Sequence, residues 1–384
     1  MIDSYNNMIL KVKSIFLFLI KLYIIIHTNI PTKNKYLKEG ASFSNIFDNT
    51  IKTNTILIFE PNAFHQECTP GYTKYFVDLG YNVDILIHIS GNESFSLFPE
   101  FENVKLFTFN NIIEIILNIT KFSIFIKKYD FILLQSNYPM NIEIYNKLGI
   151  FKLNNTFFVS HELRLFNMSF AKYLNKNRIW TLGNVSRGLQ VNPHYFGDIH
   201  LKEKNHLVRF FTTSSANRNF THLIESMMQL KKENFTFEII ITGRIAEFNS
   251  NSIPKILNEN CIFEHFISFS ELYKAIKSSD YIFIPLDPEN KHDLIFKSRK
   301  VTGCAQLVYG FLKPAIINQA FSYFYNFNTK NSLIYNNSNL YNVMKKAILL
   351  KKKDYLNLQN NLRATEKKIY QTSINNIKKA INNF

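Results

Sequence analysis

The chain has 384 residues, of which 46% are hydrophobic and 19% are charged. This length suits two domains of ordinary size, and the apolar content excludes an intrinsically disordered chain. Its three scattered cysteines, Cys68, Cys261 and Cys304, exclude a disulfide framework and show no zinc-ligand spacing. A reducing cytosol is therefore the simplest setting for the protein.

The charge is strongly basic, because 45 Lys and Arg residues outnumber 29 Asp and Glu residues, a formal net charge of +16. Such a charge attracts polyanions or an anionic membrane surface. Nucleic acid is the obvious rival partner. The lysines are dispersed, however, and no recognisable nucleic-acid module accompanies them, so the sequence disfavours nucleic-acid binding.

Residues 1–50 begin with an apolar segment that also carries basic residues. Positions 8–26 read MILKVKSIFLFLIKLYIII and include Lys11, Lys13 and Lys21. A spanning helix needs about 20 nearly uncharged residues, and a signal peptide needs a small-residue cleavage site. The segment meets neither requirement. Its pattern favours a helix lying in the membrane interface, with a helix docked on the core as the alternative.

From Thr55 onward the pattern is one of alternating strands and helices. A strand-like TILIFE (55–60), a helix-like YTKYFVDLG (72–80) and a strand-like NVDILIHI (82–89) have the length of a βαβ unit. VKLFTF, FILLQS and TFFVS predict further strands, and residues 111–128 predict a long helical stretch. Continuous apolar strands separated by helices favour a parallel sheet with both faces covered.

A second α/β set begins near Leu207. The segments 220–233, 270–280 and 302–311 predict helices, and Ser270 is the expected N-cap of the second. The expected strands are HLVRFFTTSS (206–215), FTFEIIITG (235–243), CIFEHFI (261–267), YIFIPL (281–286) and PAIIN (314–318).

The predicted fold class is therefore α/β, with two facing Rossmann-like domains. We expect an N-terminal domain at 51–190, a C-terminal domain at 191–350 and C-terminal helices at 351–384, with the interdomain stretch around 183–206. Doubly wound sheets bind ligands outside the carboxyl ends of their strands. Two facing domains would then share one cleft, which suits an enzyme that joins two substrates.

The C-terminal half resembles the retaining glycosyltransferases of the two-domain GT-B type, which include lipopolysaccharide-type transferases. The resemblance covers most of residues 207–360. It rests on the ordered series SSANRNFTHLIESM, EIIITGR, SELYKAIKSSDYIFIPL and KVTGCAQLVYGFLKPAII. FHQECTPGYTKYFVDLGYNVDIL is similar to the first βαβ unit of such enzymes, where a loop faces the acceptor.

The resemblance implies a nucleotide-sugar donor bound by the C-terminal half. Its diphosphate-binding basic residue falls on Arg218, at the start of a predicted helix, where unpaired N–H groups and the helix dipole favour anions. Two family glutamates, eight positions apart, fall on Ser298 and Gln306. Neither is Glu, so the group that approaches the transferred sugar is missing. The other expected donor-binding residues are Gly243, Lys297, Arg299, Thr302 and Gly303, with Lys300 in the same basic loop.

The N-terminal half is expected to supply the catalytic and acceptor-binding groups. His161 and Glu162 follow a predicted strand, at the place where relatives of this type carry a histidine near the transferred sugar. His65, Glu67 and Gly71 follow the first strand and are the expected acceptor contacts. A satisfied structural histidine is the alternative for His161.

No DxD-like metal site is present in the sequence, so we expect no metal and no other cofactor. Asp287, Glu289 and Asp293 are alternatives for the missing glutamate.

The predicted function is transfer of a sugar to a glycan or lipid-linked acceptor in cell-surface polysaccharide synthesis, in the cytoplasm at the inner face of the membrane. Two alternatives stay open: a non-catalytic nucleotide-sugar- or glycan-binding subunit, and a nucleotide-sugar epimerase.

Overall fold

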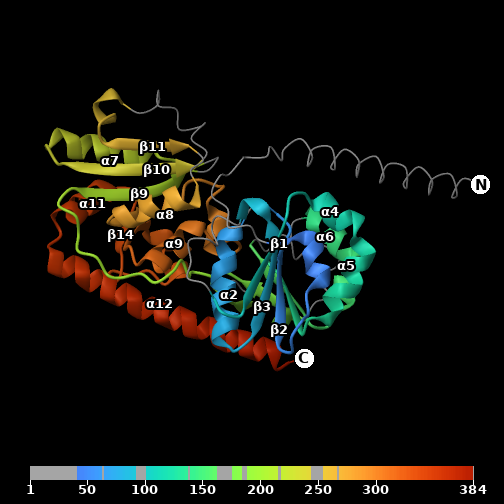
Figure 1. Cartoon of the computed structure of the whole chain (residues 1–384). Coiled ribbons are helices and arrows are strands. Elements are labelled where there is room, and N and C mark those ends of the chain that lie inside the picture. The colour runs from blue at the N-terminus through green and yellow to red at the C-terminus, as the bar shows by residue number, and fades with distance from the viewer. Residues whose placement is uncertain are drawn as a thin grey trace, which may run out of the picture.

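The computed structural model describes residues 41–62, 65–91, 101–136, 139–161, 175–183, 188–214, 218–243, 254–265 and 268–383. Within these residues the chain forms two parallel β-sheets, each with helices packed against it (Figure 1). The N-terminal segment at 1–40 and Glu162 lie outside the described residues, so the predictions made for them stay predictions.

The first sheet has eight strands in the order β1-β4-β3-β2-β5-β6-β7-β8, and every pairing is parallel. Its strands are β1 (Ala41–Ser42), β2 (Thr55–Glu60), β3 (Asn82–His88), β4 (Val104–Phe109), β5 (Phe131–Leu134), β6 (Thr156–Ser160), β7 (Ile179–Thr181) and β8 (Leu189–Gln190). All six residues of β2 are buried, as expected for a central strand covered on both faces.

The helices of this half are α2 (Thr69–Asp78), α4 (Ile112–Leu117), α5 (Ile119–Phe125) and α6 (Pro139–Lys147). The long helical stretch predicted at 111–128 is wrong as one element. Asn118 has non-helical backbone angles and separates α4 from α5, and its side-chain amide donates to the Glu114 carbonyl. Asparagine competes for backbone hydrogen bonds in this way, which favours helix ends over helix interiors.

The second sheet has six strands in the order β11-β10-β9-β12-β13-β14, again all parallel. They are β9 (Val208–Ser214), β10 (Phe237–Gly243), β11 (Cys261–His265), β12 (Tyr281–Phe283), β13 (Ala315–Asn318) and β14 (Leu333–Tyr335). The helices are α7 (Thr221–Lys232), α8 (Phe269–Ser278), α9 (Gly303–Phe311), α10 (Gln319–Ser322), α11 (Leu340–Leu349) and α12 (Lys352–Ile381).

The connection between the sheets, residues 191–207, passes closely against a helix from each half. A Cβ on Gly71 of α2 would lie 2.6 Å from the Pro193 backbone, and one on Gly310 of α9 would lie 2.5 Å from the His194 carbonyl oxygen. Only glycine tolerates such approaches without displacing the backbone. The connection is thus held between α2 and α9.

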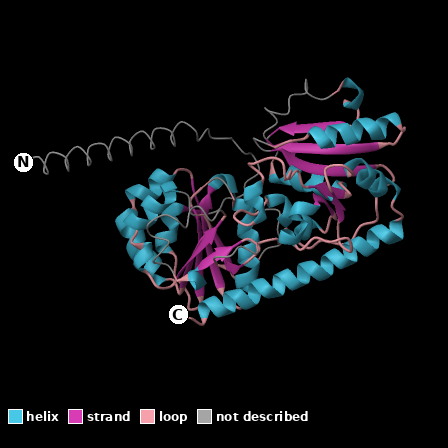
Figure 2. Cartoon of the chain, turned by 180° about the vertical axis from the view of Figure 1, so that it is seen from behind, coloured by secondary structure: helices cyan, strands magenta, loops and turns pink. Residues whose placement is uncertain are grey.

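Helix α12 contacts both halves of the molecule (Figures 1 and 2). Tyr355 and Leu362, in its first part, belong to core clusters of the second sheet. Ile374 and Ile377, near its end, pack with the first sheet, and the Ser373 hydroxyl accepts a hydrogen bond from the Asn192 amide at 3.0 Å. The last helix therefore completes the cores of both halves. Among the described residues, no helix is long and apolar enough to span a membrane.

The N-cap predicted for α8 is wrong by two residues. Ser268, and not Ser270, accepts a hydrogen bond from the Glu271 amide at 3.2 Å, while the Glu271 carboxylate accepts one from the Ser268 amide at 2.8 Å. This reciprocal pair is a capping box, and it admits Phe269 as the first helical residue.

Ser268→Ala should lower the free energy of unfolding by about 1 kcal/mol, because the Glu271 amide loses the side-chain oxygen that caps it. Ser270→Ala is the matched control and should not lower the free energy of unfolding, since alanine is the better helix former. Urea unfolding of both variants measures the difference. Equal losses would contradict the assignment of the cap.

Candidate active site

The carboxyl ends of three neighbouring strands in the first sheet carry polar residues. Glu60 ends β2, Gln135 and Ser136 follow β5, and His161 follows β6. The strand order reverses between β2 and β5, because β3 and β4 lie on one side of β2 while β5 and β6 lie on the other. Ligands of open α/β sheets bind at such a switch point.

Glu60 is the buried centre of this polar group. Its Oε1 accepts hydrogen bonds from the Asn62 amide at 2.8 Å and from the Ser136 hydroxyl at 2.6 Å. Its Oε2 has no hydrogen-bond partner among the described residues. Burial raises the pKa of Glu60 to about 7, although the bonds from Ser136 and Asn62 favour the charged form. Near neutral pH, Glu60 is therefore present partly as the protonated acid and partly as the carboxylate.

His161 follows β6, as expected from the sequence. Its Nε2 lies 3.0 Å from the Gln135 carbonyl oxygen. Burial, followed by the charge of His65, holds the pKa of His161 well below its usual range, so the ring is neutral. A carbonyl oxygen can only accept, so Nε2 carries the hydrogen and Nδ1 keeps its lone pair. The arrangement makes Nδ1 the proton-accepting atom of the ring.

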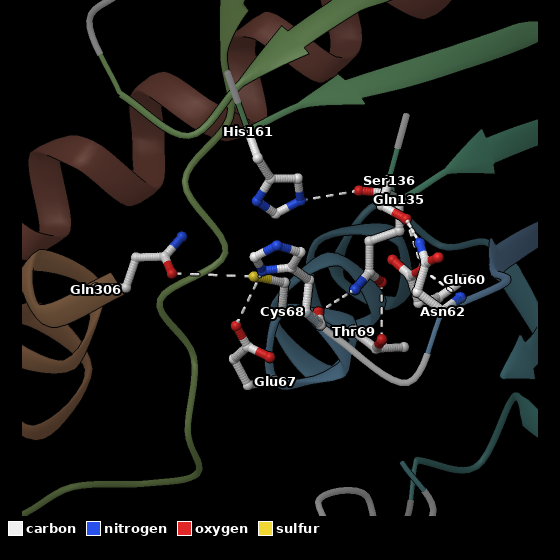
Figure 3. A network of polar contacts seen from close by, with 10 residues as sticks. Glu60, Asn62, Glu67, Cys68, Thr69, Gln135, Ser136, His161 and Gln306 are labelled. Atoms are coloured by element: carbon white, nitrogen blue, oxygen red, sulfur yellow. Dashed lines mark hydrogen bonds and ion pairs between the residues drawn. The ribbon is translucent and has the colours of Figure 1, made fainter. Parts of the chain in front are cut away.

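His65 stacks on His161, with ring centroids 3.9 Å apart and an angle of 21° between the planes. Its Nδ1 lies 3.4 Å from a carboxylate oxygen of Glu67. Burial by itself would lower the pKa of His65, but the hydrogen bond and charge of Glu67, with a smaller contribution from Glu60, outweigh it and raise the pKa. Figure 3 shows His161 and Glu67 gathered with Cys68 and with Thr69, the first residue of α2.

The second half of the molecule reaches this group through α9. Gln306 is 3% exposed, and its Oε1 lies 3.9 Å from the Cys68 sulfur (Figure 3). The Gln306 side-chain nitrogen has no hydrogen-bond partner among the described residues. Lys300 is close enough for its charge to oppose protonation of both histidines. Residues of both halves therefore meet beside the histidine stack, where Gln306 contacts Cys68 and the charge of Lys300 acts on both rings.

The start of α9 has the features of an anion-binding helix end. Its N-cap, Thr302, makes no side-chain capping bond, and a Cβ added to Gly303 would meet nothing within 4 Å. Helix amides without partners attract anions, because the dipole adds positive charge there. In the preceding loop, the Lys297 Nζ lies 5.3 Å from the Phe321 ring centroid, and Ser298 and Arg299 follow directly.

Arg218 precedes α7 by three residues, which is where the sequence predicts it. Its guanidinium donates to the Asp293 carboxylate and lies 4.5 Å from the Phe296 ring centroid. The two charged side chains are 10% and 2% exposed. Burial raises the pKa of Asp293 even though Arg218 opposes the shift. Asp293 is therefore occupied by its ion pair with Arg218.

Gly243, another residue predicted to bind the donor, ends β10 with a positive φ of 108°.

His222, Asp287 and Glu289 place possible metal-ligand atoms within 4.8 Å of one another. Both oxygens of Asp287 already accept hydrogen bonds: Oδ1 from the Glu289 amide and the Asn337 side chain, Oδ2 from the Asn219 side chain. The cluster is thus satisfied by neutral donors in this structure.

Sequence reasoning missed Asn62, Gln135 and Ser136, and it assigned no role to Glu60 and Cys68. A signal was present for three of them: TILIFE ends in the carboxylate of Glu60, and FILLQS ends in Gln135 and Ser136. Polar residues at the end of an apolar strand are candidates for a site in this fold. Gly71, also predicted as an acceptor contact, lies in α2 against Pro193.

No protein-family model and no curated protein matches the sequence. The chain is similar in structure to a glycosyltransferase from Rickettsia africae ESF-5, with a TM-score of 0.52, 14% identity, and coverage of 87% of this chain and 99% of that one. It is also similar to Anabaena Alr3699/HepE in complex with UDP-glucose (TM-score 0.49, 10% identity, coverage 85% and 98%). A third similar structure is that of a DNA-modifying β-glucosyltransferase (TM-score 0.48, 14% identity, coverage 85% and 99%).

The first of these similarities extends over most of both chains and shows a shared fold. The α/β class with two Rossmann-like, GT-B-like domains, predicted from the sequence, is confirmed.

Proposed function

We propose that the chain is a glycosyltransferase that moves a sugar from a nucleotide-diphosphate donor to a glycan or lipid-linked acceptor. The observation that carries this proposal is the closeness of His161, whose Nδ1 carries no hydrogen, to the start of α9 in the other half: the charge of Lys300 acts on the His161 ring, and Gln306 of α9 contacts Cys68. One group can accept a proton and the other can hold an anion. The Rickettsia structure of the same fold is itself a glycosyltransferase, which supports the proposal.

The donor diphosphate would lie at the start of α9. The amide of Gly303 and the cations of Lys297, Arg299 and Lys300 would neutralise it, whereas the Thr302 amide already donates to the Tyr325 hydroxyl at 3.4 Å. The unpartnered Gln306 nitrogen would donate to a ribose hydroxyl. Protein charges of this kind stabilise the departing diphosphate without a metal ion, so we propose a metal-independent reaction.

The acceptor would lie on the side of the first sheet, near His65 and Glu67. Its hydroxyl oxygen bonds to the anomeric carbon of the sugar while the bond from that carbon to the diphosphate breaks. The hydroxyl proton passes to Nδ1 of His161, which is neutral and lacks a hydrogen there. Glu162 follows directly in the sequence and stays a predicted partner in this step.

We further propose that the reaction serves cell-surface polysaccharide synthesis, in the cytoplasm at the inner face of the membrane. The support is the net charge of +16 and the Lys-bearing apolar segment at 8–26, both of which suit an anionic membrane surface.

A second candidate is a non-catalytic nucleotide-sugar-binding subunit. It is favoured by Ser298 and Gln306, which stand where the resembling family has glutamates. Both candidates bind a nucleotide sugar, but only the enzyme cleaves it. Release of nucleoside diphosphate from labelled donors, measured with and without acceptor glycans, separates them.

A thermal-shift screen with UDP-, GDP-, CMP- and ADP-sugars should find one nucleotide class that raises Tm. A ligand at a hundred times its Kd adds about 2.7 kcal/mol of stability, which is enough to measure. EDTA should leave the shift unchanged. Lys300→Ala should reduce it, whereas Lys121→Ala, on the outer helix α5, should not.

If no nucleotide sugar raises Tm, the assignment of the donor site is wrong. A shift that EDTA abolishes would contradict the metal-independent reaction and direct attention to His222, Asp287 and Glu289.

A further inference from the structure

The proposed function does not specify which of the two stacked histidines, His65 or His161, carries a positive charge. We propose that His65, held by Glu67, is a positioning residue that carries the single positive charge of the stacked pair and thereby keeps the His161 ring neutral. The charge division rests on the geometry of the pair. Only its effect on turnover rests on the proposed function.

The spacing of the two rings excludes two charges near neutral pH. Their centroids are 3.9 Å apart and their planes are nearly parallel. Two imidazolium ions at that distance repel each other strongly, even with the screening typical of a protein surface. The second proton therefore binds the pair at a much lower pH than the first, as in other coupled pairs.

The surroundings decide which ring takes the one proton. His65 has the Glu67 carboxylate 3.4 Å from Nδ1, and Glu60 adds a more distant negative charge. His161 has a backbone carbonyl as its hydrogen-bond partner and no carboxylate within ion-pair distance among the described residues. Lys300 opposes protonation of both rings, and the Cys68 thiol below them stays protonated because burial raises its pKa. The charge therefore resides on His65.

Both histidines are anchored to the same residue, which fixes the stack. The backbone carbonyl of Gln135 accepts from His161, and its side-chain amide donates to the His65 carbonyl. The Thr69 hydroxyl donates to the Gln135 side chain at 2.7 Å and so orients that amide. His65 also has a left-handed backbone, with φ of 65°, which is uncommon for residues other than glycine, although histidine, asparagine and aspartate adopt it more often than the rest. Such a conformation persists where surrounding contacts hold it in place.

The test is an NMR titration of the ring nitrogens in full-length protein labelled with ¹⁵N-histidine. In His65→Asn, the pKa of His161 should rise by about one to three pH units, because a neighbouring cation is lost. Asparagine suits the left-handed backbone at this position, so the loop should keep its conformation. Glu67→Gln should lower the pKa of His65. His88→Asn, at the end of β3, is the matched control and should move neither resonance.

An unmoved His161 pKa in His65→Asn would overturn the proposal, and so would an unmoved His65 pKa in Glu67→Gln. A second readout is the pH profile of kcat/KM: its acid limb should move to higher pH in His65→Asn, because neutral His161 is the active form. If the NMR shifts appear but no sugar transfer is found with any donor, the charge division stands and the proposed function fails.

Discussion

Replacing His161 with alanine should lower kcat about a hundredfold or more while leaving donor affinity nearly unchanged. The ring follows β6 in the half opposite the helix start that we assign to the diphosphate, so in the proposed reaction its Nδ1 would meet the acceptor hydroxyl and not the nucleotide. An interaction made mainly in the transition state lowers kcat and kcat/KM together when it is lost. Turnover and donor binding by calorimetry, measured on the same preparation, test this.

His194 supplies the matched structural comparison. It is 3% exposed, and its Nε2 lies 2.9 Å from a carboxylate oxygen of Glu366 on α12, away from the stacked histidines. His194→Ala should lower Tm and leave kcat per folded molecule nearly intact. If His161→Ala behaves in this same way, His161 is structural, and Glu67 becomes the next candidate for the catalytic role.

Arg218→Ala should lower the free energy of unfolding by about 3–5 kcal/mol, because it leaves the Asp293 carboxylate buried without its cationic partner. The loss should be greatest at alkaline pH, where Asp293 is fully charged. The pKa of this carboxyl is already raised by burial, and removing the cation raises it further, so the destabilisation diminishes as pH falls and Asp293 takes up a proton.

The double variant Arg218→Ala/Asp293→Asn separates the ion pair from the donor site. It removes both charges, so it should recover much of the lost stability. Its donor affinity should still be weaker by about 1.5–3 kcal/mol if Arg218 also binds the diphosphate. Unchanged affinity in calorimetry, together with recovered stability, would show that Arg218 serves the fold alone.

The strands with long apolar runs could be predicted from the sequence because burial on both faces leaves a continuous hydrophobic signal. Among the strands of two or three residues, β12 was predicted because it lies in the longer apolar run YIFIPL, whereas β1, β7, β8 and β14 were not, because so few residues show no pattern. The break at Asn118 was missed for a different reason: one side-chain bond to the Glu114 carbonyl outweighs an apolar run on either side.

The candidate site also has features that the sequence could predict and features that it could not. His65 and His161 were predicted because each follows a predicted strand, and Gln306 because it falls where the resembling family carries a glutamate. The stacking of the two histidines and their common anchor on Gln135 depend on which strands are neighbours. The order β2-β5-β6 is a property of the whole sheet, and no local pattern contains it.

The position of α12 has a consequence for how the protein is made. Ile374 and Ile377 complete the core of the first sheet, yet they leave the ribosome after every strand of the second sheet has been synthesised. At about 5–20 residues per second, the nascent first sheet waits on the order of ten seconds or more with that apolar surface uncovered. Its final packing therefore waits until α12 has been synthesised, and a chain that stops before α12 ends releases a first half whose core is unfinished.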